Sequence, residues 1–563
     1  MTETANSPAT PSTALKASWL PMLVILLAQI QMGFNVNAIP ISVGPITEEL
    51  GLAATSVGTA LVVYSLFVAA FVMLGAKLGA LLGARLMFQL TAVLHGVAMA
   101  MMALSVDERA MINAQALAGL AAAALVPTLV VLIAANYRGG QQAQALGLLA
   151  GAPAVSGVLA FLIAGFLGTA LSWRISFGLL FFVSLVVLAL SFRLQPVARQ
   201  KGIRIDWVGA VLAAIAVILI SLGFNNLTAW GVLLAKPAAP ISLFGLSPAP
   251  LMILVGVVVG QAFFSWSHNR QLLGQSPLIA LEVLDSPAER SAIFSLLIMS
   301  AVGPAVNFLI PVYIQIVQGR TTLQTSVAVI PYTLAIFASA VLIVRLFVRY
   351  SPRQIARIGF ILVSCGLVVL AITIRNDWGT PAVILGLVIL GLGEGSLLTV
   401  LFNVLVTSSP KELAGDVGAL RGVANNLSTA LGTAFASVMA VGLLSLFLSV
   451  SLAASAYVSA PLQAQLPLDN LEFVSNDQLV ELLRATEATS SQVTELVAIN
   501  AASRLRALKA TFLILAGISL LAVFPAGGLP GYVPGEVPAE HADDASGGRG
   551  PRRARRKSAS AAS

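Results

Sequence analysis

Long apolar stretches recur along almost the whole chain, and short segments between them carry most of the polar and charged residues. A helix needs roughly 20 mostly apolar residues to cross a bilayer, and about fourteen such windows can be placed here. The pattern therefore predicts an all-α polytopic membrane protein with about 14 transmembrane helices. The predicted spans are Trp19–Val43, Val57–Ala76, Met87–Leu104, Ala110–Asn136, Ala143–Gly168, Ile175–Phe192, Trp207–Asn226, Pro250–Trp266, Ala292–Val317, Leu323–Val344, Ile358–Ile374, Pro381–Val406, Gly422–Val450 and Ala510–Pro525.

The composition agrees with a chain surrounded by lipid. Hydrophobic residues make up 58% of it and charged residues only 10%, whereas a soluble domain carries about a quarter charged residues. A net charge of +8 would suggest nucleic-acid binding in a soluble protein. Here the excess lies in short loops and in the tail, where it orients the chain in the membrane, so we expect no nucleic-acid partner.

The basic residues also predict the orientation. Alternate loops are rich in Lys and Arg and the opposite loops are poor, which places the rich set and both termini in the cytoplasm and the protein in the cytoplasmic (plasma) membrane. The rich loops carry Lys77, Arg85, Arg138, Arg193, Arg199, Lys201, Arg204, Arg270, Arg290, Arg345, Arg349, Arg353, Arg357, Lys411 and Arg421. The poor loops carry Arg109, Lys236, Arg320 and Arg375.

Three segments are expected outside the bilayer. Residues 1–16 are predicted to be a disordered cytoplasmic N-terminus, and 528–563 a disordered basic tail. The tail's Arg552–Lys557 cluster either contacts anionic lipid head groups or serves as a solvated, orienting tail. The segment 451–507 is expected on the outer side, where Ser475 and Gln478 resemble a capping box that starts an amphipathic helix resting on the outer mouth.

Several motifs, in the same order along the chain, are similar to those of one family. Ser172-Trp173-Arg174 with Phe177 resembles its "SWRWIF", and Asp206-Trp207-Val208-Gly209-Ala210 its "DWxGA". The segment from Pro277 through Pro311, Tyr313, Gln315 and Gly319 to Pro331 resembles "PLLDL … PLYLQLVLG … P". A further set follows the pattern of its twelfth and thirteenth spans, namely Gly391, Gly393, Glu394, Gly395, Pro410, Glu412, Gly415, Gly418, Asn425 and Gly432.

These motifs resemble the fourteen-span drug:proton antiporters of the major facilitator superfamily. The resemblance implies a six-helix half at 17–193, two extra spans at 194–290 and a second six-helix half at 291–527. It also implies a central substrate cavity, alternating access by rocking of the halves, and export of hydrophobic or amphipathic compounds against proton entry.

The N-terminal half departs from the family pattern at four positions. Gln31 stands where the first span usually carries an Asp, and Ala80 stands at the acidic position of the loop after the second span. Gln115 replaces the Arg of span 4, and Phe161 replaces the proline of the "GP" in span 5. An acidic proton carrier and its neighbouring cation are thus both missing, so we expect no proton coupling in this half.

Glu394 is the strongest candidate for proton coupling. It is the only charge between Asp377 and Lys411 and lies near the middle of span 12. A carboxyl group in the membrane interior is costly, so it pairs with another group, faces a cavity or binds a proton. The competing interpretation is a structural acid that holds span 12 against its neighbours.

Five amides are candidates for the substrate cavity. Gln31 and Asn35 lie four residues apart, on one face of the first span. The others are Gln115, Asn307 and Asn425. Each of them could instead form hydrogen bonds between helices, because a membrane helix does not leave amides unpaired.

Two other polar residues have structural interpretations. His95 is either a satisfied interior group or a proton relay. Asp206 is expected to cap the seventh span.

The sequence carries no arrangement typical of an enzyme. Cys365 is the only cysteine and the three histidines are scattered, so we expect neither disulfides, a metal site nor a cofactor. There is no phosphate loop and no nucleophile–histidine pair on a common loop.

The leading hypothesis is a secondary-active exporter of small lipophilic or amphipathic compounds, with protons and membrane lipids as further partners. One alternative is an uncoupled facilitator or lipid-moving carrier. A second is a non-transporting membrane protein whose outer loop and tail bind other components.

Overall fold

The computed structural model describes residues 18–52, 54–197, 199, 204–242, 244–284, 286–320, 322–376, 381–408, 413–455, 476–484 and 489–531. Three expectations fall outside these residues: the disordered N-terminus 1–16, the basic cluster of the tail, and the capping residue Ser475. Leu529 and Pro530, which the sequence boundaries assign to the tail, are described, and their carbonyl oxygens accept hydrogen bonds from Arg353.

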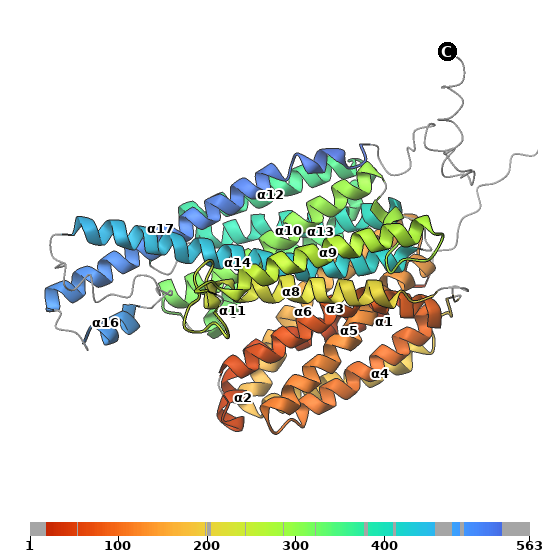
Figure 1. The fold of residues 1–563 in the computed structure, drawn as a ribbon, viewed down its shortest axis with the longest axis horizontal. Helices are drawn as coiled ribbons and strands as arrows, with labels where there is room; N and C mark the ends of the chain where they lie inside the picture. The colour runs from red at the N-terminus through yellow and green to blue at the C-terminus, as the bar shows by residue number, and fades with distance from the viewer. Residues whose placement is uncertain are drawn as a thin grey trace, which may run out of the picture.

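Within the described residues, 14 helices are long and apolar enough to cross a membrane, which confirms the predicted number. They run side by side in alternating directions (Figure 1). The helices are α1 (Leu20–Ile41), α3 (Ala54–Leu82), α4 (Ala84–Ala103), α5 (Glu108–Asn136), α6 (Gly139–Ala170), α7 (Trp173–Ser191), α8 (Trp207–Trp230), α9 (Pro248–Leu272), α10 (Pro287–Pro311), α11 (Thr322–Leu342), α12 (Pro352–Thr373), α13 (Pro381–Ser408), α14 (Ala414–Ala454) and α17 (Ser490–Leu521). Shorter helices are α2 (Val43–Leu50), η1 (Leu281–Leu284), η2 (Val312–Val317), η3 (Ile343–Val348), α16 (Asn476–Arg484) and η6 (Pro525–Gly528).

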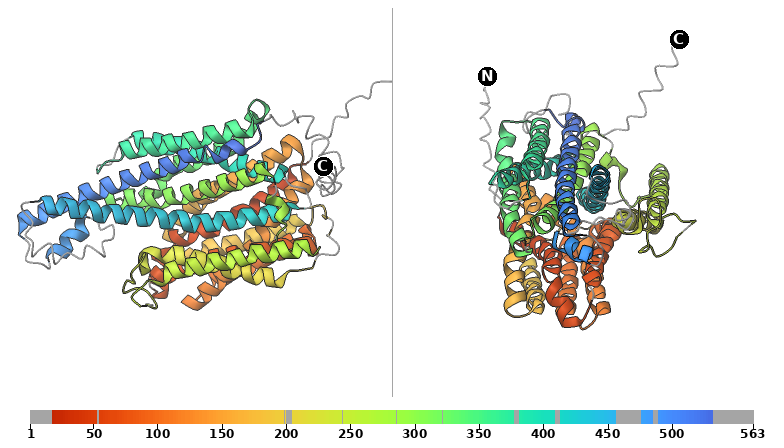
Figure 2. Two further views of the ribbon diagram at one scale, coloured as in Figure 1. Left: turned by 45° about the horizontal axis from the view of Figure 1, so that its top comes forward. Right: turned by 90° about the vertical axis from the view of Figure 1, so that its left-hand side faces the viewer.

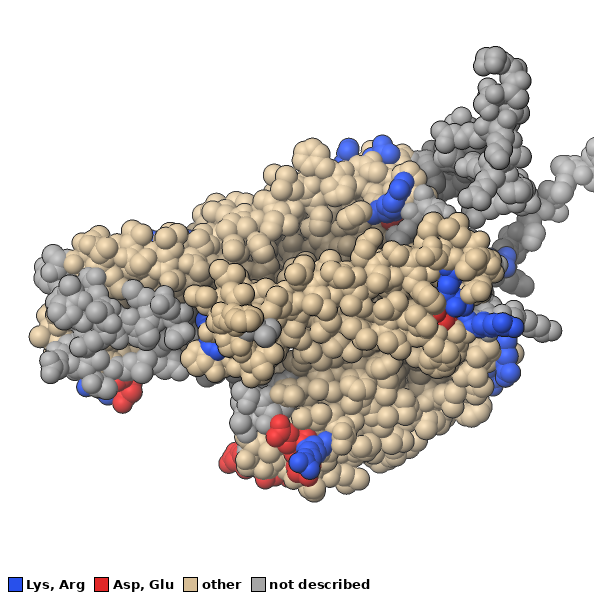
Figure 3. All heavy atoms as spheres, viewed as in Figure 1, with Lys and Arg blue, Asp and Glu red and all other residues tan. Residues whose placement is uncertain are grey.

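Two hydrophobic cores divide most of the helices between them. One is built mainly by α1–α7 and the other mainly by α10–α14 and α17. Figure 1 shows the two groups as a lower red-to-orange bundle and an upper green-to-blue bundle. We call the end at which α1 begins and α17 ends the proximal end, and the end that carries α2 and α16 the distal end. In Figure 3, Lys and Arg gather at the proximal end of the visible face.

Helices α8 and α9 are an additional pair that packs mainly on itself. Figure 2 shows α9, in yellow-green, at the outer side of the bundles. Helix α8 also contacts α3 and α14, and a small apolar cluster joins Val72 and Met73 of α3, Val217 of α8 and Val423 of α14. The inserted pair therefore lies against the junction of the two bundles.

Local hydrogen bonds explain where several helices begin. Asp206 accepts a hydrogen bond from the backbone N–H of Gly209 at 3.0 Å, which confirms it as the cap of α8.

At the distal end, Arg174 of α7 donates to Glu49 at 2.8 Å and to the carbonyl oxygens of Ala103 and Ser105. The hydrogen bond from Arg174 holds the pKa of Glu49 below its usual range. The Trp-Arg motif thus fastens α2 and α4 to the start of α7.

Helix α13 packs closely on its neighbours through its glycines. A Cβ atom on Gly391 would lie 2.6 Å from the carbonyl oxygen of Tyr332, and one on Gly395 would lie 2.1 Å from that of Ile336. On the opposite face, a Cβ on Gly393 would lie 2.8 Å from the carbonyl oxygen of Gly359. Small residues let membrane helices approach in this way, and here they place Glu394 between α10 and α11.

Replacing Gly395 by Ala should lower the melting temperature of the purified protein by several degrees. The methyl group meets backbone of α11, which cannot rotate away, so the helices must separate and lose packing. The matched control is Gly442→Ala in α14, because a Cβ there has nothing within 4 Å. Thermal unfolding followed by gel filtration compares the two variants, and equal melting temperatures would contradict the packing argument.

The distal end differs from the sequence boundaries. The segment 451–507 is more helical at its two ends than expected, because α14 continues to Ala454 and α17 begins at Ser490, twenty residues before the predicted last span. Polar residues such as Glu495 and Asn500 end the hydropathy signal there, but the helix continues and is capped by Thr489 and Gln492. Helix α14 has 41 residues, roughly 60 Å at about 1.5 Å per residue, so it projects well beyond a bilayer core.

Helix α16 packs on this projection. Leu483 of α16 lies in an apolar cluster with Leu452 of α14 and Leu496 of α17. The buried guanidinium of Arg504 donates to the side chain of Asn476 and to the carbonyl oxygen of Ile316. The expected helix is therefore present, but its described contacts lie on the α14–α17 projection and not at the mouth of a cavity.

Candidate functional site

The two bundles touch through the proximal parts of their helices. A Cβ on Gly418 of α14 would lie 2.8 Å from Cα of Pro127 in α5, and one on Gly147 of α6 would lie 2.6 Å from the carbonyl oxygen of Ala340 in α11. Lys77 of α3 and Asp416 of α14 form an ion pair of 2.9 Å across the same contact. These contacts close the space between the bundles toward the proximal end.

A cavity of about 790 Å³ lies on the distal side of these contacts. Its lining reaches the distal helix ends, at Ile41 of α1 and Pro311 of α10. Both bundles contribute, so a molecule bound here would contact the two halves at once. The polar lining comprises Gln29, Asn37, Ser300, Asn307, Thr325, Tyr332, Thr333, Glu394, Arg421, Asn425 and Asn426. The larger apolar side chains are those of Val126, Phe161, Met299, Val329, Ile330, Ile336 and Leu398.

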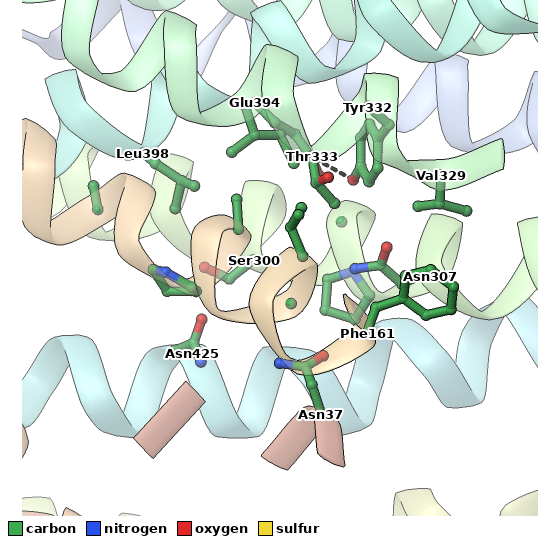
Figure 4. A pocket seen from close by; sticks show the side chains of 18 of the residues that line it. Asn37, Phe161, Ser300, Asn307, Val329, Tyr332, Thr333, Glu394, Leu398 and Asn425 are labelled. Atoms are coloured by element: carbon green, nitrogen blue, oxygen red, sulfur yellow. Dashed lines mark hydrogen bonds between the residues drawn. The ribbon is translucent and has the colours of Figure 1, made fainter. Parts of the chain in front are cut away.

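Glu394 lines this cavity from the middle of α13. Its Oε2 accepts a hydrogen bond from the hydroxyl of Tyr332 in α11 (Figure 4). Its Oε1 is buried, has no hydrogen-bond partner among the described residues and lies where a Cβ on Gly303 would approach to 2.5 Å. A carboxyl group held on one oxygen and unpaired on the other, at the edge of a cavity between the bundles, has the placement that proton exchange requires.

Two of the predicted amides, Asn307 and Asn425, lie in the same cavity as Glu394. Both are exposed to it. The sequence interpretation missed Asn37 and Tyr332, which also line the cavity. In Figure 4, Asn37 and Asn425 lie toward the side opposite Glu394 and Tyr332. Asn37 lies two residues after Asn35, so the prediction chose the correct helix but the wrong face.

The other three predicted amides lie inside the N-terminal bundle, away from the cavity lining. Asn35 of α1 and Gln115 of α5 form two mutual hydrogen bonds, of 2.9 and 3.2 Å. Gln31 accepts a hydrogen bond from Ser184 of α7 at 3.1 Å, and Ser184 lies 3.4 Å from His95. All are buried, and this is the arrangement of interhelical hydrogen bonds that the sequence left as the alternative.

The placement of Arg421 corrects a sequence expectation. The residue was assigned to a basic loop, but it lies inside α14, two turns after the helix begins at Ala414, and it lines the cavity. Its guanidinium carbon lies 4.2 Å from the centre of the Phe402 ring. The hydropathy pattern placed the start of this span too late, because the helix begins with the polar Gly-Asp-Val-Gly segment.

Phe161, which stands where the family pattern has a proline, also lines the cavity. Helix α6 carries a cavity-lining proline two turns earlier, at Pro153.

No group of three or more His, Cys, Asp or Glu side chains in the described part of the chain is arranged to hold a metal ion. The polar side chains that line the cavity supply one carboxyl group, one guanidinium, amides and hydroxyls.

Comparison with known proteins agrees with this architecture. The chain is 25% identical over 441 residues to the puromycin resistance protein pur8 of Streptomyces alboniger, covering 76% of this chain and 83% of that one. It is 23% identical to the tetracenomycin C resistance and export protein of Streptomyces glaucescens, covering 78% and 80%. It is 24% identical to the multidrug efflux pump LfrA of Mycolicibacterium smegmatis, covering 76% and 82%.

Solved structures show the same fold. The human organic anion transporter MFSD10 aligns with a TM-score of 0.53 at 13% identity, covering 90% of this chain and 98% of that one. The proton:xylose symporter XylE aligns with a TM-score of 0.50 at 13% identity, covering 90% and 94%. Residues 25–433 match the family model described as Major Facilitator Superfamily. The chain therefore belongs to the major facilitator superfamily of membrane transporters, and its described part contains 14 helices long and apolar enough to span a membrane.

Proposed function

We propose that this transporter exports hydrophobic or amphipathic small molecules across the plasma membrane, with Glu394 as the residue that carries the coupling proton. The observation that carries the proposal is the cavity itself, which is shared by both bundles, is largely apolar and contains a single carboxyl group. The names of the relatives, which include a puromycin resistance protein and a tetracenomycin C export protein, agree with export of such compounds.

The mechanism follows from the contacts. The distal cavity closes and a proximal one opens when the contact at Lys77 and Asp416 separates. Glu394 is then exposed alternately to the two sides, and it binds a proton on one and releases it on the other. The buried amides of the N-terminal bundle hold that bundle together as it moves. The six-helix halves 17–193 and 291–527 are the proposed moving units.

A flux assay tests the proposal. Purified protein in liposomes should accumulate puromycin or tetracenomycin C when an outward proton gradient of about two pH units is imposed, with the lumen acidic, relative to liposomes without protein. An exporter that exchanges substrate for protons takes substrate into the lumen as protons leave it. Accumulation that also occurs to the same level without a gradient would support an uncoupled facilitator. The proposed export function would be contradicted if neither compound were transported, nor any member of a panel of amphipathic carboxylates, phosphates and sulfonates.

The proposed orientation gives a further prediction, with both termini in the cytoplasm. In a Cys365→Ser background, a cysteine at the exposed distal residue Ser490 should react with a membrane-impermeant thiol reagent in intact cells. A cysteine at exposed Gln195, in the proximal connection between α7 and α8, should react only after the membrane is opened. The reverse labelling pattern would invert the topology.

A further inference from the structure

Arg421 is a positive charge inside the bundle that the proposed proton pathway does not use. It lies about 10 Å along α14 from the first helical residue, by the rise of roughly 1.5 Å per residue, and is half-buried in the cavity lining. A cation at such a depth normally pairs with an acid or faces water in a cavity. Its contact with the Phe402 ring, at 4.2 Å, orients the guanidinium but does not neutralise its charge.

Among the residues that the structure describes, the two acidic groups nearest to Arg421 along α14 and across the cavity have other partners. Asp416, five residues earlier on α14, pairs with Lys77 and accepts a hydrogen bond from the backbone N–H of Ala280 at 3.1 Å. Glu394, across the cavity lining, accepts from Tyr332. No carboxylate of the described residues lies within 4.0 Å of the Arg421 guanidinium. The cavity therefore contains a guanidinium that forms no ion pair with any described carboxylate.

The neighbours of Arg421 complete a binding site for an acidic group. Asn425 lies one turn further along the same face of α14, is exposed to the cavity and offers amide N–H donors. Beyond these polar groups, Val126, Ile336 and Leu398 supply an apolar wall. A guanidinium binds carboxylate, phosphate and sulfonate oxygens through two parallel N–H donors, and this binding strengthens where water is scarce.

We propose that Arg421 binds the acidic group of the substrate, so that the cavity selects amphipathic anions: molecules with an apolar body and one carboxylate, phosphate or sulfonate. This inference rests on the proposed transport function and names its substrate class. The apolar body lies along Ile336 and Leu398, and the acidic group lies between Arg421 and Asn425. Arg421 is thus a specificity-determining residue, distinct from the proton site at Glu394.

A matched pair of fluorescent probes tests the inference on the purified full-length protein at equilibrium. 8-Anilinonaphthalene-1-sulfonate carries the acidic group, and N-phenyl-1-naphthylamine has the same aromatic skeleton without it. Replacing Arg421 by Gln should raise the Kd of the sulfonate about ten- to hundredfold, the range for a lost hydrogen bond to a charged group, and leave the Kd of the neutral probe unchanged. Arg421→Lys keeps the charge but loses the paired donors, so its Kd should be intermediate.

Two controls distinguish loss of the contact with the acidic group from a change in net charge and from misfolding. Arg345→Gln removes the same charge from an exposed position outside the cavity and should change neither Kd. Unchanged binding of the neutral probe, with a single gel-filtration peak, shows that Arg421→Gln is folded. If both probes lose affinity equally, or if Arg421→Gln binds the sulfonate as tightly as the unmodified protein, the inference is wrong.

The source of the anion is distinguished by competition. Dodecyl phosphate below its micellar concentration should displace the sulfonate probe, whereas inorganic phosphate at the same concentration should not. Displacement by inorganic phosphate alone would overturn the amphipathic part of the inference.

Because no gradient is applied, these binding measurements are independent of proton coupling. The Glu394→Gln variant should bind the sulfonate at least as tightly as the unmodified protein, since the change removes a negative charge from the same cavity. If transport is proton-coupled but the Kd of the sulfonate does not change in Arg421→Gln, the proposed function stands and this inference is wrong.

Discussion

Replacing Glu394 by Gln should abolish gradient-driven accumulation of substrate while sparing passive exchange. The amide keeps the size of the side chain and can still bond with Tyr332, but it cannot release a proton. Without that step the transporter can still alternate with substrate bound, so exchange across the membrane continues. We expect accumulation under a pH gradient to fall to the level of liposomes without a gradient. Uptake with and without an imposed gradient, measured for the same preparation, gives the result.

A structural role for Glu394 predicts a different outcome. In that case Gln preserves both packing and driven transport, whereas Glu394→Ala lowers expression or thermal stability, because it empties the space beside Gly303. Gln115→Ala is the matched control, since it removes a buried polar group that lies outside the cavity. It should reduce stability but leave the pH dependence of transport in place. Full driven transport by the Gln variant would remove Glu394 from the coupling role.

The number of spans could be predicted from the sequence because it depends on a simple property. Each bilayer crossing needs a long run of apolar residues, and this requirement holds whatever the helices pack against. The helix ends beyond the membrane could not be found in this way. Around Ser490 to Asn500 the side chains are polar enough to end the hydropathy signal, although α17 packs there on α14 and α16.

The candidate site was only partly predictable, for a similar reason. Glu394 stood out because an isolated carboxyl group is rare within an apolar span, and that rarity is visible in one sequence. Which amides reach the cavity depends on how each helix is rotated in its bundle. Asn35 and Asn37 lie two residues apart on the same helix, yet Asn35 bonds with Gln115 inside the bundle and Asn37 lines the cavity. Tyr332 lies 62 residues before Glu394, and nothing in the local sequence of either residue indicates that they meet.

Breaking the ion pair between Lys77 and Asp416 should shift the transporter away from the conformation described here. The pair joins α3 to α14 at the closed proximal contact, and its side chains are only 13% and 7% exposed. Asp416 also accepts a hydrogen bond from the backbone N–H of Ala280, in the connection from α9 to α10. The inserted helices are thus tied to the contact that must open for the substrate to enter from the proximal side.

The change that breaks the pair most strongly is Lys77→Glu, because it places two carboxylates together at a buried contact. Removing one partner of a buried pair costs about 3 kcal/mol, so a conformational equilibrium that depends on it should move by about a hundredfold. The double variant Lys77→Glu with Asp416→Lys restores an opposite pair, but it leaves the N–H of Ala280 facing an ammonium group. We therefore expect it to recover the equilibrium in part.

Spin labels across the distal end measure this shift. In a Cys365→Ser background, labels at exposed Val106, between α4 and α5, and at exposed Asn376, after α12, report the separation of the two bundles. Lys77→Glu should add a population with a shorter distance, as the distal side closes and the proximal side opens. The control Glu481→Gln breaks an equally short ion pair of 2.9 Å that lies within α16 and should leave the distances unchanged. Unaltered distances in Lys77→Glu would mean that the glycine contacts at Gly418 and Gly147 hold the proximal side closed without the ion pair.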